Sequence, residues 1–118
     1  MTQTLPKPIT EYFEASNTVD AGRLIAAFAD DALVNDARRE FWGTEAIKRW
    51  SATEVIGEKV TLDVKKVRKH YGAFVVDAIV DEEFDEAYPP YLVVLTHYFT
   101  VSDDKIVSLI IIRNTHAE

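Results

Sequence analysis

Asp36 is the residue whose position most strongly suggests chemistry. It follows the short apolar run 32–34, which is typical of a core strand. A carboxylate at the end of such a strand is costly to bury unless it is paired or hydrogen-bonded. Two interpretations stay open: a hydrated strand-end acid paired with Arg38 or Arg39, or a general base held at the apolar mouth of a pocket.

Three further candidates lie on segments with helical periodicity. Tyr12 either points its hydroxyl into a pocket, where it donates a hydrogen bond to a ligand, or is an ordinary core aromatic residue. Trp50 and Glu54 lie one turn apart on the apolar stripe of a later helix, and we expect both to line the ligand pocket. The alternatives are a tryptophan that plugs the pocket and a solvated acid at the helix end.

The segment "YLVVLTHYFTV" contributes two more candidates, Thr96 and Tyr98, which share one strand face with Val94. Alternate residues of a strand point to opposite faces. If Thr96 lines the cavity, Tyr98 lines it as well and His97 points to the outer face of the sheet. We therefore expect Thr96 and Tyr98 to bind ligand and His97 to be a packed, hydrogen-bonded residue.

Composition argues against several classes of function. The 118 residues include no cysteine, and 20 acidic against 13 basic residues give a formal net charge of −7. Such a surface repels phosphate backbones and anionic lipid, so we expect no nucleic-acid partner and no membrane association. The three histidines lack metal-ligand spacing, so we expect no metal and no cofactor. The lack of cysteine and of a signal peptide fits a cytoplasmic location.

Helical periodicity precedes strand periodicity along the chain. It predicts helices over about 8–17, from Asp20 to the acids at 30–31, and from Gly43 to Gly57. Extended segments are expected at 33–36, 37–43, 59–67 with a bulge at 65–66, 73–84, 91–101 and 105–114, with an acidic turn over 81–90. This order predicts an α+β fold whose helices pack on one face of a curved antiparallel sheet and leave a conical pocket.

The motifs "ITEYFEASN", "FADDALVND", "GTEAIKRW", "THYFTV" and "KIVSL" resemble the nuclear transport factor 2-like (NTF2-like) superfamily. Within it the chain is similar to SnoaL-like and ketosteroid-isomerase-like proteins. The resemblance covers nearly the whole chain, and it implies a single domain over 1–118 with the cystatin-like cone. It identifies the fold better than the activity, because this fold hosts several enzyme types and plain binding modules.

Ketosteroid isomerases use a helix-one Tyr, an Asp at the end of the first strand and a protonated Asp on a late strand, a case of carboxyl pKa tuning that serves as a general example. By motif, the resemblance assigns the first two roles to Tyr12 and Asp36 in this sequence. The late acid is replaced by Thr96, a weaker hydrogen-bond donor. Loss of one such donor typically costs about 100- to 1000-fold in rate, which argues against steroid isomerisation.

Two functions remain open from the sequence. In the first, the protein is a proton-transfer enzyme of the isomerase, cyclase or dehydratase type, acting on a small hydrophobic carbonyl compound with Asp36 as base. In the second, it is a non-catalytic module that binds a small ligand or forms a dimer. An epoxide hydrolase would need an inner-face arginine, and Arg113 lies near the chain end.

We also expect a homodimer through the convex sheet face. Broad apolar strips on the last two strands would be exposed to water in a monomer, and a second copy of the chain would cover them. The strips are expected to comprise Val93, Leu95, His97, Phe99, Val107, Leu109 and Ile111.

Overall fold

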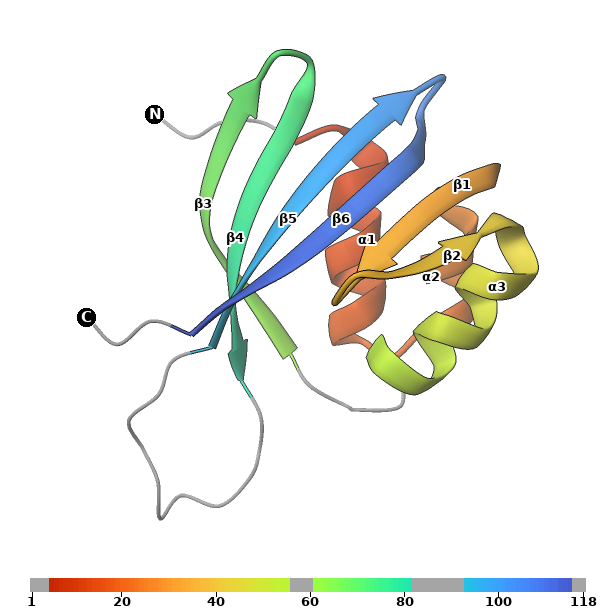
Figure 1. Ribbon diagram of the computed structural model, residues 1–118, viewed down its shortest axis with the longest axis horizontal. Helices are drawn as coiled ribbons and strands as arrows, with labels where there is room; N and C mark the ends of the chain where they lie inside the picture. The colour runs from red at the N-terminus through yellow and green to blue at the C-terminus, as the bar shows by residue number, and fades with distance from the viewer. Residues whose placement is uncertain (1–4, 56–60, 82–92, 116–118) are drawn as a thin grey trace.

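The structure is a computed structural model, and it describes residues 5–55, 61–81 and 93–115 (Figure 1). The described helices are α1 (Lys7–Asn17), α2 (Ala21–Ala26) and α3 (Gly43–Trp50), the last followed by a π-helical turn, η1 (Ser51–Val55). The described strands are β1 (Phe28–Asp36), β2 (Arg39–Trp42), β3 (Thr61–His70), β4 (Ala73–Asp81), β5 (Val93–Ser102) and β6 (Lys105–Thr115).

The six described strands form one sheet in the order β2-β1-β6-β5-β4-β3. Within these strands β1 and β6 pair in parallel, and the other neighbours pair in antiparallel fashion. The helices lie on one side of the sheet (Figure 1). The predicted α+β class and the cystatin-like arrangement are therefore confirmed.

The first two helices begin where their capping residues predict. Pro8 lies in the first turn of α1, and the Asp20 carboxylate accepts a hydrogen bond from the Arg23 backbone N–H at 3.1 Å. At its other end, α1 is fastened to the sheet by Asn17. Its side-chain amide donates to the Leu62 carbonyl at 3.0 Å and accepts from the Leu62 N–H at 2.7 Å. This pair of bonds holds α1 across the inner face of the sheet.

The predicted end of the second helix was wrong. Helix α2 stops at Ala26, and β1 already begins at Phe28, so that Asp30 and Asp31 are strand residues. The pairing of β1 with β6 shifts register between Phe28 and Leu33, and both acids are exposed. Two successive exposed residues break the alternation that normally identifies a strand, which explains why these acids resembled a helix end.

The later strands agree with the predicted segments. The register of β3 against β4 shifts between Val64 and Lys66, which confirms the predicted bulge. In β4, Val76 and Ala78 lie in the core, as expected. The predicted helix stop at Gly57, the end of the 73–84 strand beyond Asp81 and most of the acidic turn over 81–90 lie outside the described residues.

The predicted faces of β5 were wrong. Phe99 and His97 are fully buried, and His97 packs against the rings of Tyr12 and Phe13 on α1. Thr96 and Tyr98 are therefore on the outer face, opposite the helices. Both faces of β5 are apolar enough to be buried, so alternation alone does not distinguish inside from outside.

The proposed dimer strip has the same error. Leu95, His97, Phe99, Leu109 and Ile111 contribute to the helix-side core or pack against it. The large apolar side chains left exposed on the outer face of β5 and β6 are instead Tyr98, Ile110 and Ile112. No described helix is long and apolar enough to cross a membrane. The single-domain assignment and the cytoplasmic location stay predictions.

Candidate functional site

A small cavity of about 50 Å³ lies between α1, the end of α3 and the inner face of the sheet. Its polar lining residues come from five helical or strand elements: Tyr12, Ser16, Asp36, Trp50, Glu54 and His97. Its apolar lining residues are Val55, Leu62, Leu95 and Ile111. Polar groups that converge in an apolar cleft are the usual composition of a ligand site.

Asp36 is held in this cavity by a tryptophan. As the last residue of β1, it pairs in register with Ile111 of β6, and the exposed fraction of its side chain is 22%. Trp50 Nε1–H donates to Asp36 Oδ2 at 2.9 Å, and Trp50 itself is buried. Among the described residues, Asp36 Oδ1 accepts no hydrogen bond. The carboxylate is therefore fixed at one oxygen and open at the other.

Arg39 is the basic partner expected for Asp36 under the alternative interpretation. Its guanidinium is 3.9 Å from Asp36 Oδ2 and 3.5 Å from Glu54 Oε1, and its side chain is half exposed. Contacts of this length that involve a half-exposed guanidinium contribute little to stability. Arg38 forms no ion pair among the described residues. The Trp50 hydrogen bond, not an arginine, is the closest contact that orients Asp36.

Tyr12 is buried against aromatic rings, including those of Phe13, Phe28 and Phe99. Burial, together with the negative charge of Asp36, raises the pKa of the Tyr12 phenol well above its ordinary value. Its hydroxyl therefore stays protonated at neutral pH. Among the described residues it has no hydrogen-bond partner, so it is available as a donor to a ligand.

His97 is a site residue that the sequence did not identify as one. Its ring stacks on Phe99 with an interplanar angle of 6° and a centroid separation of 5.8 Å. Burial lowers the pKa of His97 to about 4, although hydrogen bonds to backbone carbonyls oppose the shift. The ring is therefore neutral at neutral pH. His97 lies on the same strand face as Leu95 and Phe99. Had those two residues been assigned to the core from the sequence, His97 would have been placed there as well.

Glu54 lies at the rim of the cavity. Its side chain is 38% exposed and faces Arg39. Four predicted site residues, Tyr12, Asp36, Trp50 and Glu54, therefore line one cavity.

Thr96 and Tyr98 do not line this cavity. Thr96 Oγ1 donates to Asp77 Oδ1 at 2.8 Å, and Asp77 also pairs with Arg68 at 3.3 Å. This cluster lies on the outer face of the sheet, where Tyr98 is 36% exposed. Their assignment to the ligand pocket followed from the wrong face of β5. The polar side chain of β5 that does line the cavity is the one between them, His97.

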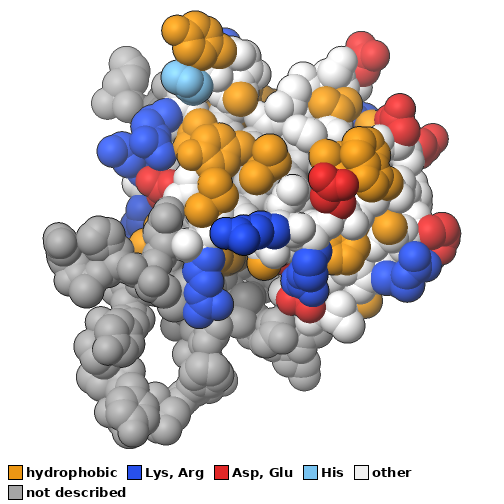
Figure 2. All heavy atoms as spheres, in the orientation of Figure 1, with side chains coloured by type: hydrophobic (Ala, Val, Ile, Leu, Met, Phe, Trp, Pro, Cys, Tyr) orange, Lys and Arg blue, Asp and Glu red, His pale blue; other side chains and the backbone are white. Residues whose placement is uncertain are grey.

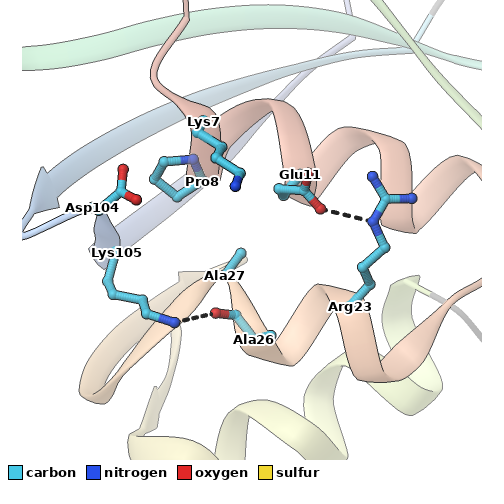
Figure 3. A pocket seen from close by; sticks show the side chains of 8 residues that line it. All are labelled: Lys7, Pro8, Glu11, Arg23, Ala26, Ala27, Asp104 and Lys105. Atoms are coloured by element: carbon cyan, nitrogen blue, oxygen red, sulfur yellow. Dashed lines mark hydrogen bonds and ion pairs between the residues drawn. The ribbon is translucent and has the colours of Figure 1, made fainter.

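A larger groove of about 270 Å³ lies between α1, α2 and the β5–β6 turn (Figure 3). Its charges are largely paired internally. Arg23 contacts Glu11 and Glu14 at 2.7 Å each, and Lys105 donates to the Ala26 carbonyl at 2.7 Å. Exposed ion pairs of this kind are common on protein surfaces. In the described part of the chain, no group of three or more acidic or histidine side chains is arranged to hold a metal ion.

Solved structures with this fold cover nearly the whole chain. A provisionally named polyketide cyclase from Sinorhizobium meliloti is 30% identical, with 92% of this chain and 95% of the other covered and a TM-score of 0.79. A ketosteroid-isomerase-like protein from Catenulispora acidiphila, solved in complex with trimethylamine, is 21% identical over 92% and 86% of the chains, with a TM-score of 0.75. No family model and no curated protein matches the sequence.

A protein from Kribbella flavida, provisionally named a ketosteroid isomerase, is 13% identical over 96% of this chain and 79% of its own, with a TM-score of 0.77. At that identity the likeness concerns the fold alone. An α+β cone with a small helix-covered cavity, together with the 30% identical relative, defines the class of protein. The chain belongs to the NTF2-like superfamily, and its similarity to the polyketide cyclase-like protein associates it with the SnoaL-like members.

Proposed function

We propose that the protein is a proton-transfer enzyme that acts on a small hydrophobic carbonyl compound, with Asp36 as general base. The observation that carries this proposal is the arrangement of Asp36. One carboxylate oxygen is anchored by Trp50 at 2.9 Å, the other is unengaged among the described residues, and both Asp36 and Tyr12 line the same cavity. A base must be both oriented and free to accept a proton.

The chemical step follows from these two groups. Asp36 Oδ1 takes a proton from the carbon next to the carbonyl, and the electron pair of that C–H bond moves to the carbonyl oxygen, which gives an enolate. Tyr12, kept protonated by its surroundings, donates a hydrogen bond to the oxygen that gains charge. In a β,γ-unsaturated carbonyl compound, the enolate extends over the double bond, so that return of the proton from Asp36 to the γ-carbon restores the carbonyl group and isomerises the compound. Attack of the enolate carbon on a second carbonyl closes a ring instead.

The cavity limits the substrate. Its volume of about 50 Å³ is well below the roughly 300–1,000 Å³ of sites for drug-sized ligands. A small ketone, or one end of a longer molecule, is the matching class. The similarity to the provisionally named polyketide cyclase supports carbonyl chemistry, and the trimethylamine complex of the ketosteroid-isomerase-like protein shows that this fold can hold a small ligand.

The test is a reaction that needs only the proposed first step. Cyclohexanone in D₂O exchanges its α-hydrogens when a base removes them, and proton NMR follows the loss of signal. We expect the protein to accelerate exchange and Asp36→Asn to lower that acceleration by roughly 100-fold or more. Asp31→Asn is the matched control, because Asp31 is an exposed acid of the same strand. Equal rates for wild type and Asp36→Asn would contradict the proposal.

A non-catalytic ligand-binding module is the second candidate. Two observations favour it: the small cavity, and His97 on the inner face of the late strand, where a ketosteroid isomerase uses a protonated acid. A neutral ring lacks the donating strength of a carboxylic acid. The exchange experiment separates the candidates, because a binding module would hold cyclohexanone without accelerating exchange.

We also propose a homodimer through the outer sheet face. Tyr98, Ile110 and Ile112 are 36%, 39% and 45% exposed and lie on the neighbouring strands β5 and β6. Figure 2 shows hydrophobic side chains gathered over the β4–β6 part of this face. Exposed apolar surface of this kind commonly marks a protein–protein contact.

A further inference from the structure

Two buried polar atoms have no hydrogen-bond partner among the described residues: Ser16 Oγ and His97 Nε2. Both residues line the same small cavity, and their relative exposures are 2% and 0%. Buried polar atoms in folded proteins are nearly always paired, since an unpaired one destabilises the folded state. Their coincidence in one cavity therefore points to a missing polar partner.

The state of the His97 ring determines what that partner must be. Nδ1 is 3.1 Å from the Leu95 carbonyl oxygen and 3.3 Å from that of Val76. Carbonyl oxygens can only accept hydrogen bonds, so His97 Nδ1 carries the ring hydrogen and donates it. The ring is buried and neutral at neutral pH. Nε2 is thus a bare acceptor, and it needs a group that donates.

The other groups around the cavity complete the requirement. Asp36 Oδ1 is a second open acceptor, whereas Ser16 and the protonated Tyr12 hydroxyl can donate or accept. A bare carbonyl or an ether oxygen would leave His97 Nε2 unpaired. An alcohol, phenol or enol supplies the missing hydrogen and can accept one in return.

We infer that the cavity binds a hydroxyl group of its ligand, with His97 Nε2 as the acceptor and Ser16 as a further polar contact. This inference rests on the proposed function, because it takes the same cavity to be the ligand site. It narrows the ligand to small hydroxylated or enolic compounds. It also makes His97 a specificity-determining residue, since the site should bind isosteric compounds that lack the hydroxyl hydrogen more weakly.

The test compares phenol with anisole, in which a methyl group replaces the hydroxyl hydrogen. We expect wild type to bind phenol about 10-fold more tightly than anisole, as measured by NMR titration, because anisole leaves the buried acceptor unpaired. His97→Asn retains an N–H that can reach the two backbone carbonyls but lacks Nε2, so we expect it to lose the preference. Ser51→Ala is the control, because Ser51 is equally buried and bonds to the Lys48 carbonyl outside the cavity.

A second readout does not depend on the variant folding. In wild type, the ¹⁵N resonance of His97 Nε2 should move when phenol is added and stay in place when anisole is added. Equal affinities for the two compounds, an unmoved resonance, or no phenol binding at millimolar concentration would each overturn the inference. Asp36→Asn separates the two proposals, because it should lower proton exchange by roughly 100-fold or more, while the ¹⁵N resonance of His97 Nε2 should still move when phenol is added.

Discussion

Acidification should destabilise the protein through His97. The pKa of this buried ring is about 4 in the folded protein, against 6.5 for an unperturbed histidine. Between these values the unfolded chain binds a proton at His97 and the folded chain does not. Stability from this residue is therefore fully present above about pH 6.5 and decreases as the pH falls toward 4.

The magnitude follows from the difference between the two pKa values. Each pKa unit corresponds to about 1.4 kcal/mol in the free energy of unfolding. The whole difference between the two pKa values of His97 therefore corresponds to about 3 kcal/mol, which is lost once the pH falls below both values. About 2 kcal/mol of this is lost between pH 7 and pH 5. For a domain of this length the expected fall in melting temperature is roughly 6–10 °C. The nearby Asp77 carboxylate favours the charged ring, but burial outweighs its effect on the pKa of His97.

The assay is urea unfolding of wild type and His97→Asn at pH 7 and at pH 5. Carboxylates elsewhere also titrate in this range, so the informative quantity is the difference between the two proteins. We expect wild type to lose about 2 kcal/mol more than the variant. Parallel losses in both would refute the claim that His97 is buried and neutral.

Three further variants test the site and the corrected strand face. Trp50→Phe removes the donor to Asp36 Oδ2, so α-proton exchange of cyclohexanone should slow by at least roughly 10-fold, and the free energy of unfolding in urea should fall by about 1–2 kcal/mol. An unchanged exchange rate would mean that the hydrogen bond does not orient the base. Thr96→Val removes the bond to Asp77 on the outer face and should cost about 1 kcal/mol while it leaves exchange unaffected; slower exchange would restore Thr96 to the pocket. Ile112→Glu places a charge on the exposed apolar surface, and sedimentation should show dimer for wild type and monomer for the variant, whereas a monomeric wild type would disprove the dimer.

The helix starts and one strand irregularity were readable from local chemistry. Proline in the first turn, the Asp20 cap and the phase slip at Lys65–Lys66 act over a few residues, so a sequence displays them directly. Tyr12 and Asp36 line one cavity as the family resemblance implied.

Tertiary contacts account for what the sequence did not reveal. The bond from Trp50 to Asp36 joins residues 14 apart through the packing of α3 on β1, and no local pattern encodes it. The face of β5 depends on which of two apolar sets meets α1. Phe99 and His97 pack there, whereas Thr96 finds Asp77 on the other side. Because the wrong face of β5 was assigned to the core from the sequence, His97 was not included in the expected site.

The α-proton exchange rate of cyclohexanone tests the central claim most directly when wild type, Asp36→Asn, Tyr12→Phe and the double variant are measured side by side. If Asp36 removes the proton and Tyr12 stabilises the resulting oxyanion, Asp36→Asn should lose roughly 100-fold or more and Tyr12→Phe less. The double variant should then be little slower than Asp36→Asn alone, because groups that act on one transition state are not additive. An exchange rate that Asp36→Asn leaves at the wild-type value, in a protein that still binds cyclohexanone, would contradict the account.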